Sequence, residues 1–141
     1  MMRLYPSITK KTKLKEQILI VDSEWNMLKL LYAVLSDQFD LVTKNSSVDA
    51  LQWLESGNKP ALIITEFQLP YLDGASFIRH LKYSGIFNST PVIVLSHAND
   101  IEAKIKNVAF QVGAIISKPF NPSYLIFKIN TLLHEYKSAM A

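Results

Sequence analysis

Polar side chains able to bind a cation or a phosphoryl group follow four short apolar runs of the sequence. They comprise two acids, several hydroxyls, an imidazole and an amine: Asp22, Ser23, Glu66, Ser96, His97, Ser117 and Lys118. Carboxylates and hydroxyls are ligands for hard cations, and an amine beside them can contact a phosphoryl group. The set therefore predicts a cation or phosphoryl site if the fold brings the ends of these runs together. No glycine-rich loop follows the first run, which argues against a nucleotide site.

Predicted strands and predicted helices alternate along the chain around these residues. Most of the strands are continuous apolar runs that fit a sheet buried on both faces, and they cover residues 17–22, 39–43, 61–65, 92–95 and 114–117. Apolar residues at helical spacing follow each strand and predict helices over about 24–35, 47–56, 74–83, 101–113 and 122–137. Ser23 is the expected N-cap of the first helix, and Ser46 or Ser47 that of the second, which Gly57 ends.

Five such units in succession predict an α/β fold with a five-stranded parallel sheet and helices on both faces. Right-handed crossovers favour the doubly wound, flavodoxin-like arrangement, with strand order 2-1-3-4-5. The carboxyl ends of its strands form one edge of the sheet, where the working cleft of such folds lies. The polar residues listed above all fall at that edge.

The composition excludes several other classes of protein. The chain has 141 residues, which is too short for two domains of ordinary size. Of these residues, 49% are hydrophobic and 19% are charged, which excludes a disordered chain. Its apolar runs are too short for a transmembrane helix. Cysteine is absent, which excludes a disulfide framework, a thiolate nucleophile and Cys-ligated zinc. The first residues lack the apolar core of a secretion signal, so we expect a cytoplasmic protein that does not engage a membrane.

The net charge of +3 is concentrated at the N-terminus. Residues 1–15 hold five of the 15 basic residues and no acid, whereas residues 16–141 hold ten basic and 12 acidic residues. We therefore expect a basic flexible lead at 1–15 and one domain at 16–141. A solvated lead is favoured over a nucleic-acid contact, which would bind less tightly as salt is raised.

Four motifs, in order, resemble the receiver domain of two-component response regulators over roughly residues 17–137. They are Ile18–Asp22 with Glu24 and Asn26, Leu69–Gly74 with its Pro-x-x-Asp-Gly pattern, Pro91–Ser96, and Lys118–Phe120. The resemblance implies a role in signal transduction without enzymatic activity. It also implies a protein partner, such as a histidine kinase or another signalling protein.

The resemblance also shows where this sequence departs from the receiver pattern. Glu66, four residues before Pro70, stands where receivers have a phosphate-accepting aspartate, and Asp22–Ser23 stands where they have an acidic pair that holds magnesium. Ile115 replaces the usual Tyr or Phe that moves inward on activation. By contrast, Ser96 and Lys118 match the hydroxyl and the lysine that contact the phosphoryl group.

These departures predict that Glu66 is not efficiently phosphorylated. Its carboxylate lies roughly 1.5 Å farther from the backbone than that of aspartate, and phosphoryl transfer depends on positioning and on the metal. Two interpretations have equal weight: Glu66 pairs with Lys118 as an inert structural group, or it partly mimics the phosphorylated state. Contact between Glu66 and Ser96 would favour mimicry, and a pair with Lys118 would favour the inert role.

The leading functional prediction is an atypical receiver that acts by phosphorylation-independent protein–protein interaction, with no output domain on this chain. One alternative is a magnesium-dependent phosphorylation switch that uses Asp22, Glu66, Ser96 and Lys118. The other alternative is nucleic-acid contact through the basic lead. No cofactor is expected, because Asp22 and Glu66 alone are a weak candidate for a magnesium site.

Two further groups of residues each have a structural and a functional interpretation. His97 is expected to be a solvent-exposed histidine rather than a general base, and the two tryptophans are expected to be packing residues, in part exposed, rather than base-stacking platforms. On the last helix, Ile126 and Phe127 lie off the predicted core stripe of Leu125, Ile129, Leu132, Leu133 and Tyr136. Together with Ile115 they form a candidate face for partner docking or a homodimer, weighed evenly against scattered surface apolar residues.

Overall fold

The computed structural model describes residues 14–97 and 112–140 and contains one parallel sheet. Its strands are β1 (Gln17–Val21), β2 (Asp40–Lys44), β3 (Leu62–Glu66), β4 (Val92–His97) and β5 (Ala114–Lys118). They lie in the order β2-β1-β3-β4-β5, and every neighbouring pair is parallel. This confirms the predicted doubly wound, flavodoxin-like fold.

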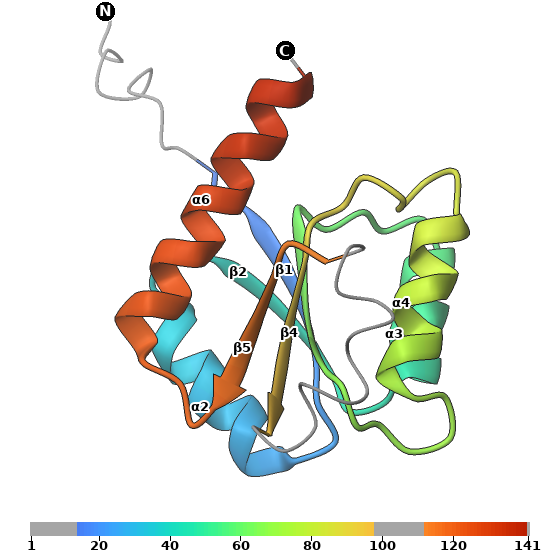
Figure 1. Cartoon of the computed structure of the whole chain (residues 1–141), viewed down its shortest axis with the longest axis horizontal. Coiled ribbons are helices and arrows are strands. Elements are labelled where there is room, and N and C mark those ends of the chain that lie inside the picture. The colour runs from blue at the N-terminus through green and yellow to red at the C-terminus, as the bar shows by residue number, and fades with distance from the viewer. Residues whose placement is uncertain (1–13, 98–111, 141) are drawn as a thin grey trace, which may run out of the picture.

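Helices cover both faces of the sheet (Figure 1). On one face, α2 (Trp25–Leu35) and α6 (Pro122–Met140) share a hydrophobic cluster with the sheet, here called the α2/α6 layer. On the other face, α3 (Ser47–Glu55) and α4 (Gly74–Tyr83) share a second cluster, the α3/α4 layer. The helix predicted over 101–113 lies almost entirely outside the described residues. No helix in the described part of the chain is long and apolar enough to cross a membrane.

The alternation of side chains along β1 explains why its residues after Gln17 are all apolar. Ile18 and Ile20 belong to the α2/α6 layer, whereas Leu19 and Val21 belong to the α3/α4 layer. Successive residues of a strand point to opposite faces, so a sheet covered on both sides needs apolar residues at every position. Asp22, the first polar residue after this apolar run, follows the last residue of the strand at the edge of the sheet.

The predicted N-cap residue is confirmed for α3 but not for α2. Ser46 caps α3 as predicted, because its side chain accepts a hydrogen bond from the backbone N–H of Asp49, and Gly57 follows the helix with a φ of +102°. The prediction that Ser23 caps the first helix is wrong. Glu24 occupies the N-cap of α2 without a side-chain cap, and Asp22 Oδ1 accepts from the backbone N–H of Glu24 instead.

Candidate functional site

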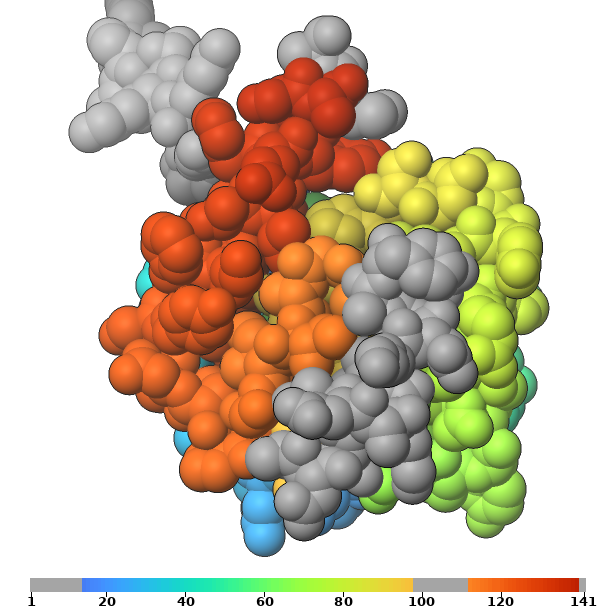
Figure 2. Space-filling model, viewed as in Figure 1, coloured from blue at the N-terminus to red at the C-terminus, as the bar shows by residue number. Residues whose placement is uncertain are grey.

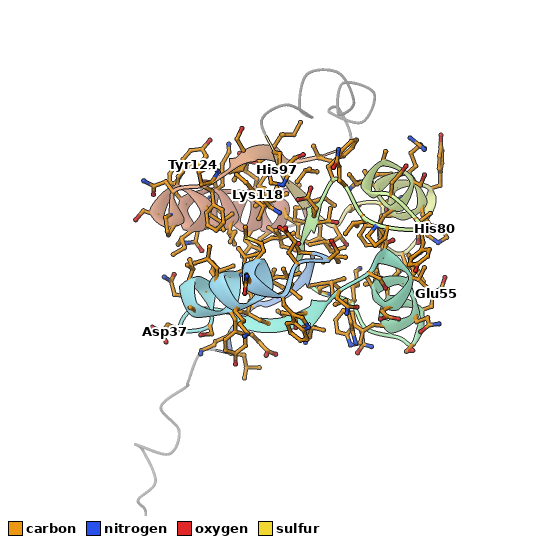
Figure 3. The ribbon with its side chains drawn as sticks, turned by 90° about the horizontal axis from the view of Figure 1, so that it is seen from below. Asp37, Glu55, His80, His97, Lys118 and Tyr124 are labelled. Carbon is orange, nitrogen blue, oxygen red and sulfur yellow. The ribbon has the colours of Figure 1, made fainter. Side chains whose placement is uncertain are left out.

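Three charged side chains meet at the carboxyl edge of the sheet. Asp22 follows β1, Glu66 is the last residue of β3, and Lys118 is the last residue of β5. All three are buried, with Glu66 4% and Lys118 7% exposed. The ammonium of Lys118 lies 2.8 Å from Asp22 Oδ2 and 2.5 Å from Glu66 Oε1. Lys118 is thus the common partner of both acids. It lies beside His97, its neighbour on β4 in the register of the sheet (Figure 3).

The second oxygen of each acid is bound by the backbone. Asp22 Oδ1 accepts from the N–H of Glu24 at 2.8 Å, and Glu66 Oε2 accepts from the N–H groups of Phe67 and Gln68 at 2.5 and 3.0 Å. Buried charges are tolerated when they are paired and their remaining hydrogen-bonding positions are filled. Both carboxylates satisfy this condition without any group from outside the chain.

The loop that supplies these amides is held in place by Gly74. The Gly74 N–H donates to the carbonyl of Phe67 at 2.8 Å. A Cβ at position 74 would lie 2.5 Å from that carbonyl oxygen and 2.8 Å from the carbonyl oxygen of Glu66. Only glycine allows this approach, so the start of α4 directly positions the backbone that binds Glu66.

The electrostatics of the site raise the pKa of Lys118. Burial of the ammonium lowers its pKa, but hydrogen bonds and charge attraction from Asp22 and Glu66 outweigh that effect, so the pKa lies above its ordinary value of 10.5. Glu24 adds a longer contact of 3.9 Å from an exposed carboxylate. Lys118 therefore stays charged throughout the physiological range.

The raised pKa predicts a pH dependence of stability. A basic group with a raised folded-state pKa stabilises the fold fully below its ordinary pKa, and that contribution is lost as pH rises through the folded-state value. We expect the difference in unfolding free energy between the native chain and a Lys118→Met variant to be constant up to about pH 10 and to narrow above 10.5. Urea unfolding of both proteins between pH 8 and 12 measures it. A difference that widens over this interval would contradict the assignment.

Ser96, on the neighbouring strand β4, does not take part in this network. Its side chain is fully buried, and its Oγ has no hydrogen-bond partner among the described residues. Glu66 therefore contacts Lys118 and not Ser96, which is the arrangement expected for the inert role. Ser23 is exposed and makes no hydrogen bond or ion pair with the cluster among the described residues.

The residues present do not fit a magnesium site. Each acid already gives one oxygen to the ammonium of Lys118 and the other to backbone N–H groups. The small cavity beside them, about 200 Å³, is lined by Asp22, Ser23, Glu24, Glu66, Gln68 and His97. Within residues 14–97 and 112–140, no three His, Asp or Glu side chains are grouped so that they could hold a metal ion.

Ile115 and Ile126, two of the candidate docking residues, pack on opposite faces of the sheet. Ile115 is half-buried against the α3/α4 layer, whereas Ile126 is half-buried against the α2/α6 layer rather than off the core stripe. Phe127 is 62% exposed, and Tyr124, one turn earlier, is also exposed. The surfaces of β5 and α6 adjoin on one face of the molecule (Figure 2). The exposed apolar surface of α6 is therefore formed by Tyr124 and Phe127.

Two aromatic residues close in sequence to the acidic residues, Trp25 and Tyr71, are exposed. Trp25 was expected to pack but is largely exposed, while Trp53 is half-buried against the α3/α4 layer as expected. Tyr71, in the loop between β3 and α4, is almost fully exposed and has a φ of 67°. A positive φ in a residue other than glycine is uncommon. His97 is exposed, as predicted.

Comparison with known proteins gives one consistent family. Residues 18–130 match the family model of the response regulator receiver domain. The transcriptional regulatory protein PcoR of Escherichia coli is 31% identical over 129 residues, covering 89% of this chain and 55% of PcoR. Response regulator Rre1 of Synechocystis is 29% identical over 118 residues, covering 82% of this chain and 51% of Rre1. The chain thus spans about half the length of these curated relatives.

Solved structures agree with the sequence matches. A putative response regulator from Chloroflexus aurantiacus has a TM-score of 0.78 and 26% identity, covering 85% of this chain and 98% of the other. A response regulator receiver domain protein from Clostridium thermocellum has a TM-score of 0.79 and 25% identity, covering 88% and 98%. The similarity extends over nearly the whole length of both solved domains.

Proposed function

The chain belongs to the response regulator receiver domain family, and on this premise we propose that it signals by protein–protein interaction without phosphorylation of Glu66. The observation that supports this proposal is the state of the Glu66 carboxylate. One of its oxygens contacts the Lys118 ammonium, and the other accepts from two backbone N–H groups. The group at the acceptor position is engaged on both sides by the chain itself.

An engaged carboxylate is a poor phosphoryl acceptor. In-line transfer requires a nucleophilic oxygen aligned with the phosphorus, together with positive charge that neutralises the transferred group. To attack, Glu66 would have to break a buried contact with Lys118 or its contacts with the amides of Phe67 and Gln68. Ser23 supplies no second carboxylate to hold a metal beside Asp22. Both the alignment of the nucleophilic oxygen and the neutralisation of the transferred charge are therefore weakened.

The contacts favour an inert structural role for Glu66 over mimicry of the phosphorylated state. A mimic would engage Ser96, whose hydroxyl is buried and without a partner among the described residues. A single carboxylate also carries less charge and fewer acceptor oxygens than a phosphoryl group. In this proposal, the pair with Lys118 holds the ends of β3 and β5 in one fixed arrangement, and the surface presented to partners does not depend on a kinase.

The proposed partner is a signalling protein, such as a histidine kinase, or a second copy of this chain. Tyr124 and Phe127 on α6 offer exposed apolar surface for such a contact. Aromatic side chains are enriched in protein interfaces because they bury a large area at low entropic cost.

A spectroscopic titration tests the proposal. Amide NMR spectra of the native chain are recorded with magnesium and increasing beryllium fluoride, which imitates a phosphoryl group bound to a carboxylate. We expect the amides of Glu66, Ser96 and Lys118 to keep their positions, because Glu66 is engaged and the metal does not fit. The matched control is the double variant Ser23→Asp/Glu66→Asp, which restores the receiver pattern and is expected to show saturable shifts. Saturable shifts at these residues in the native chain would instead support a working switch.

A further inference from the structure

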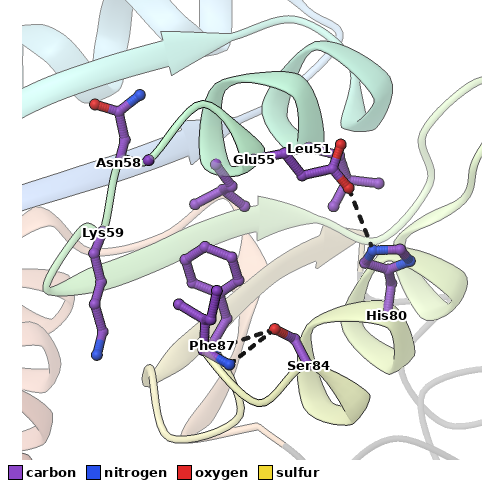
Figure 4. A pocket seen from close by; sticks show the side chains of 10 residues that line it. Leu51, Glu55, Asn58, Lys59, His80, Ser84 and Phe87 are labelled. Atoms are coloured by element: carbon purple, nitrogen blue, oxygen red, sulfur yellow. Dashed lines mark hydrogen bonds and ion pairs between the residues drawn. The ribbon is translucent and has the colours of Figure 1, made fainter.

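A cavity of about 450 Å³ opens between the C-terminal ends of α3 and α4, away from the acidic edge (Figure 4). Apolar side chains from α3 and from the loop after α4 line it, namely Leu51, Leu54, Ile86 and Phe87, and α4 contributes His80. Leu54 and Phe87 are buried, whereas Ile86 is 62% exposed at the rim. The volume lies within the roughly 300–1,000 Å³ typical of small-molecule sites, which are likewise mostly apolar with a few polar groups.

The walls of this cavity are held by hydrogen bonds within the loops. Ser84 Oγ accepts from the backbone N–H groups of Ile86 and Phe87 at 3.1 and 3.3 Å, which fixes the loop after α4 (Figure 4). Across the cavity, Asn58 Nδ2 donates to the carbonyl of Trp53 at 2.7 Å and ties down the loop after α3. A ligand entering here would meet a largely preformed surface, so little binding energy would be lost in ordering it.

The charges around the rim distinguish its two sides. Glu55 lies 3.9 Å from His80 on one side, where both are exposed. Lys59 lies on the other side and has no ion pair or hydrogen bond among the described residues, so its ammonium is available to an anion (Figure 4). Because Ser84 Oγ accepts from two amides, the hydrogen of its hydroxyl also remains available for donation.

We propose that this cavity binds a small amphipathic monocarboxylate. Its apolar body covers Leu54, Ile86 and Phe87, and its carboxylate faces Lys59. The proposal is independent of the state of Glu66, because none of the residues lining the cavity belongs to the acidic cluster. It assigns the receiver domain a small-molecule site on the α3/α4 side of the sheet.

The test uses 2-naphthoate as the probe and 2-naphthamide, its neutral analogue, as the reference ligand. Each is titrated into the whole chain while amide and methyl NMR signals are recorded. We expect saturable shifts centred on Leu51, Leu54 and Ile86, with naphthoate binding roughly 1.5- to fivefold more tightly than naphthamide, as for an exposed ion pair. Absence of saturable shifts at these residues, or shifts centred elsewhere, would overturn the proposal.

Two variants measure separately what the charge and the apolar surface contribute to ligand affinity. Lys59→Gln is expected to bring naphthoate affinity down to that of naphthamide, whereas Lys29→Gln, an equally exposed change on α2, is expected to leave it unchanged. Ile86→Ser is expected to weaken both ligands severalfold, and the exposure of Ile86 makes the change compatible with folding. Equal loss in the Lys59 and Lys29 variants would overturn the assignment of the carboxylate to Lys59.

Discussion

Replacing Lys118 with methionine is expected to lower the free energy of unfolding by about 3–5 kcal/mol, the range measured when one partner of a buried ion pair is removed. The variant leaves Asp22 and Glu66 buried at the same edge without the ammonium that contacts both. Methionine keeps most of the length and apolar area of the lysine stem, so packing is largely retained. Urea unfolding at pH 7 measures the loss.

Two controls assign the effect to the charge network. Lys29→Met, on the exposed surface of α2, is expected to change stability by no more than about 0.5 kcal/mol. Adding Glu66→Gln to the Lys118→Met variant removes one of the two unpaired charges and is expected to recover part of the lost stability. A Lys118→Met variant within 1 kcal/mol of the native chain would show that the buried contacts are absent in solution.

Gly74→Ala is expected to destabilise the chain by roughly 1–3 kcal/mol, as overpacking does at a site that cannot relax freely. The added Cβ would lie 2.5–2.8 Å from backbone atoms of Glu66 and Phe67. Relief requires the β3–α4 loop to move, and this loop supplies two of the N–H groups that bind Glu66. Amide NMR should therefore show shifts at Phe67 and Gln68 as well as a lower unfolding free energy.

Gly85→Ala is the matched control for this substitution. A Cβ at position 85 has no heavy atom within 4 Å and no positive φ to strain it, so the substitution is expected to be neutral or slightly stabilising. If the two variants were equally stable, close packing at the start of α4 would not be what holds the loop.

The fold could be predicted because its local and long-range patterns agree. Ile18 to Val21 are apolar at every position, as a strand covered on both faces requires. Polar residues then mark the end of the strand, and apolar residues at helical spacing follow them. Because the strands are parallel, their carboxyl ends form one edge, and this alone predicts that Asp22, Glu66 and Lys118 lie close together.

The details of the site depend on side-chain geometry that periodicity does not contain. Ser23 and Asp22 are both residue types that bind backbone N–H groups at helix starts, and in the structure Asp22 Oδ1 accepts from the Glu24 N–H. Similarly, the sequence left the partner of Glu66 open between Lys118 and Ser96. The choice depends on distances across three strands.

Helical spacing also did not predict the burial of two residues near the start of their helices. Trp25 fits the helical spacing of α2, but it is the first residue of that helix and remains exposed where the helix begins. Ile126 falls beside the core stripe of α6 and still packs against it, because the buried part of a helix is wider than a single row of residues.

The proposal behind these predictions is that Glu66, held by Lys118, does not accept a phosphoryl group. Its most direct test is the intact mass of the native chain after incubation with acetyl phosphate and magnesium, beside the Ser23→Asp/Glu66→Asp variant under the same conditions. We expect an unchanged mass for the native chain and a gain of one phosphoryl group for the variant. A phosphoryl gain in the native chain that disappears in Glu66→Gln would contradict it.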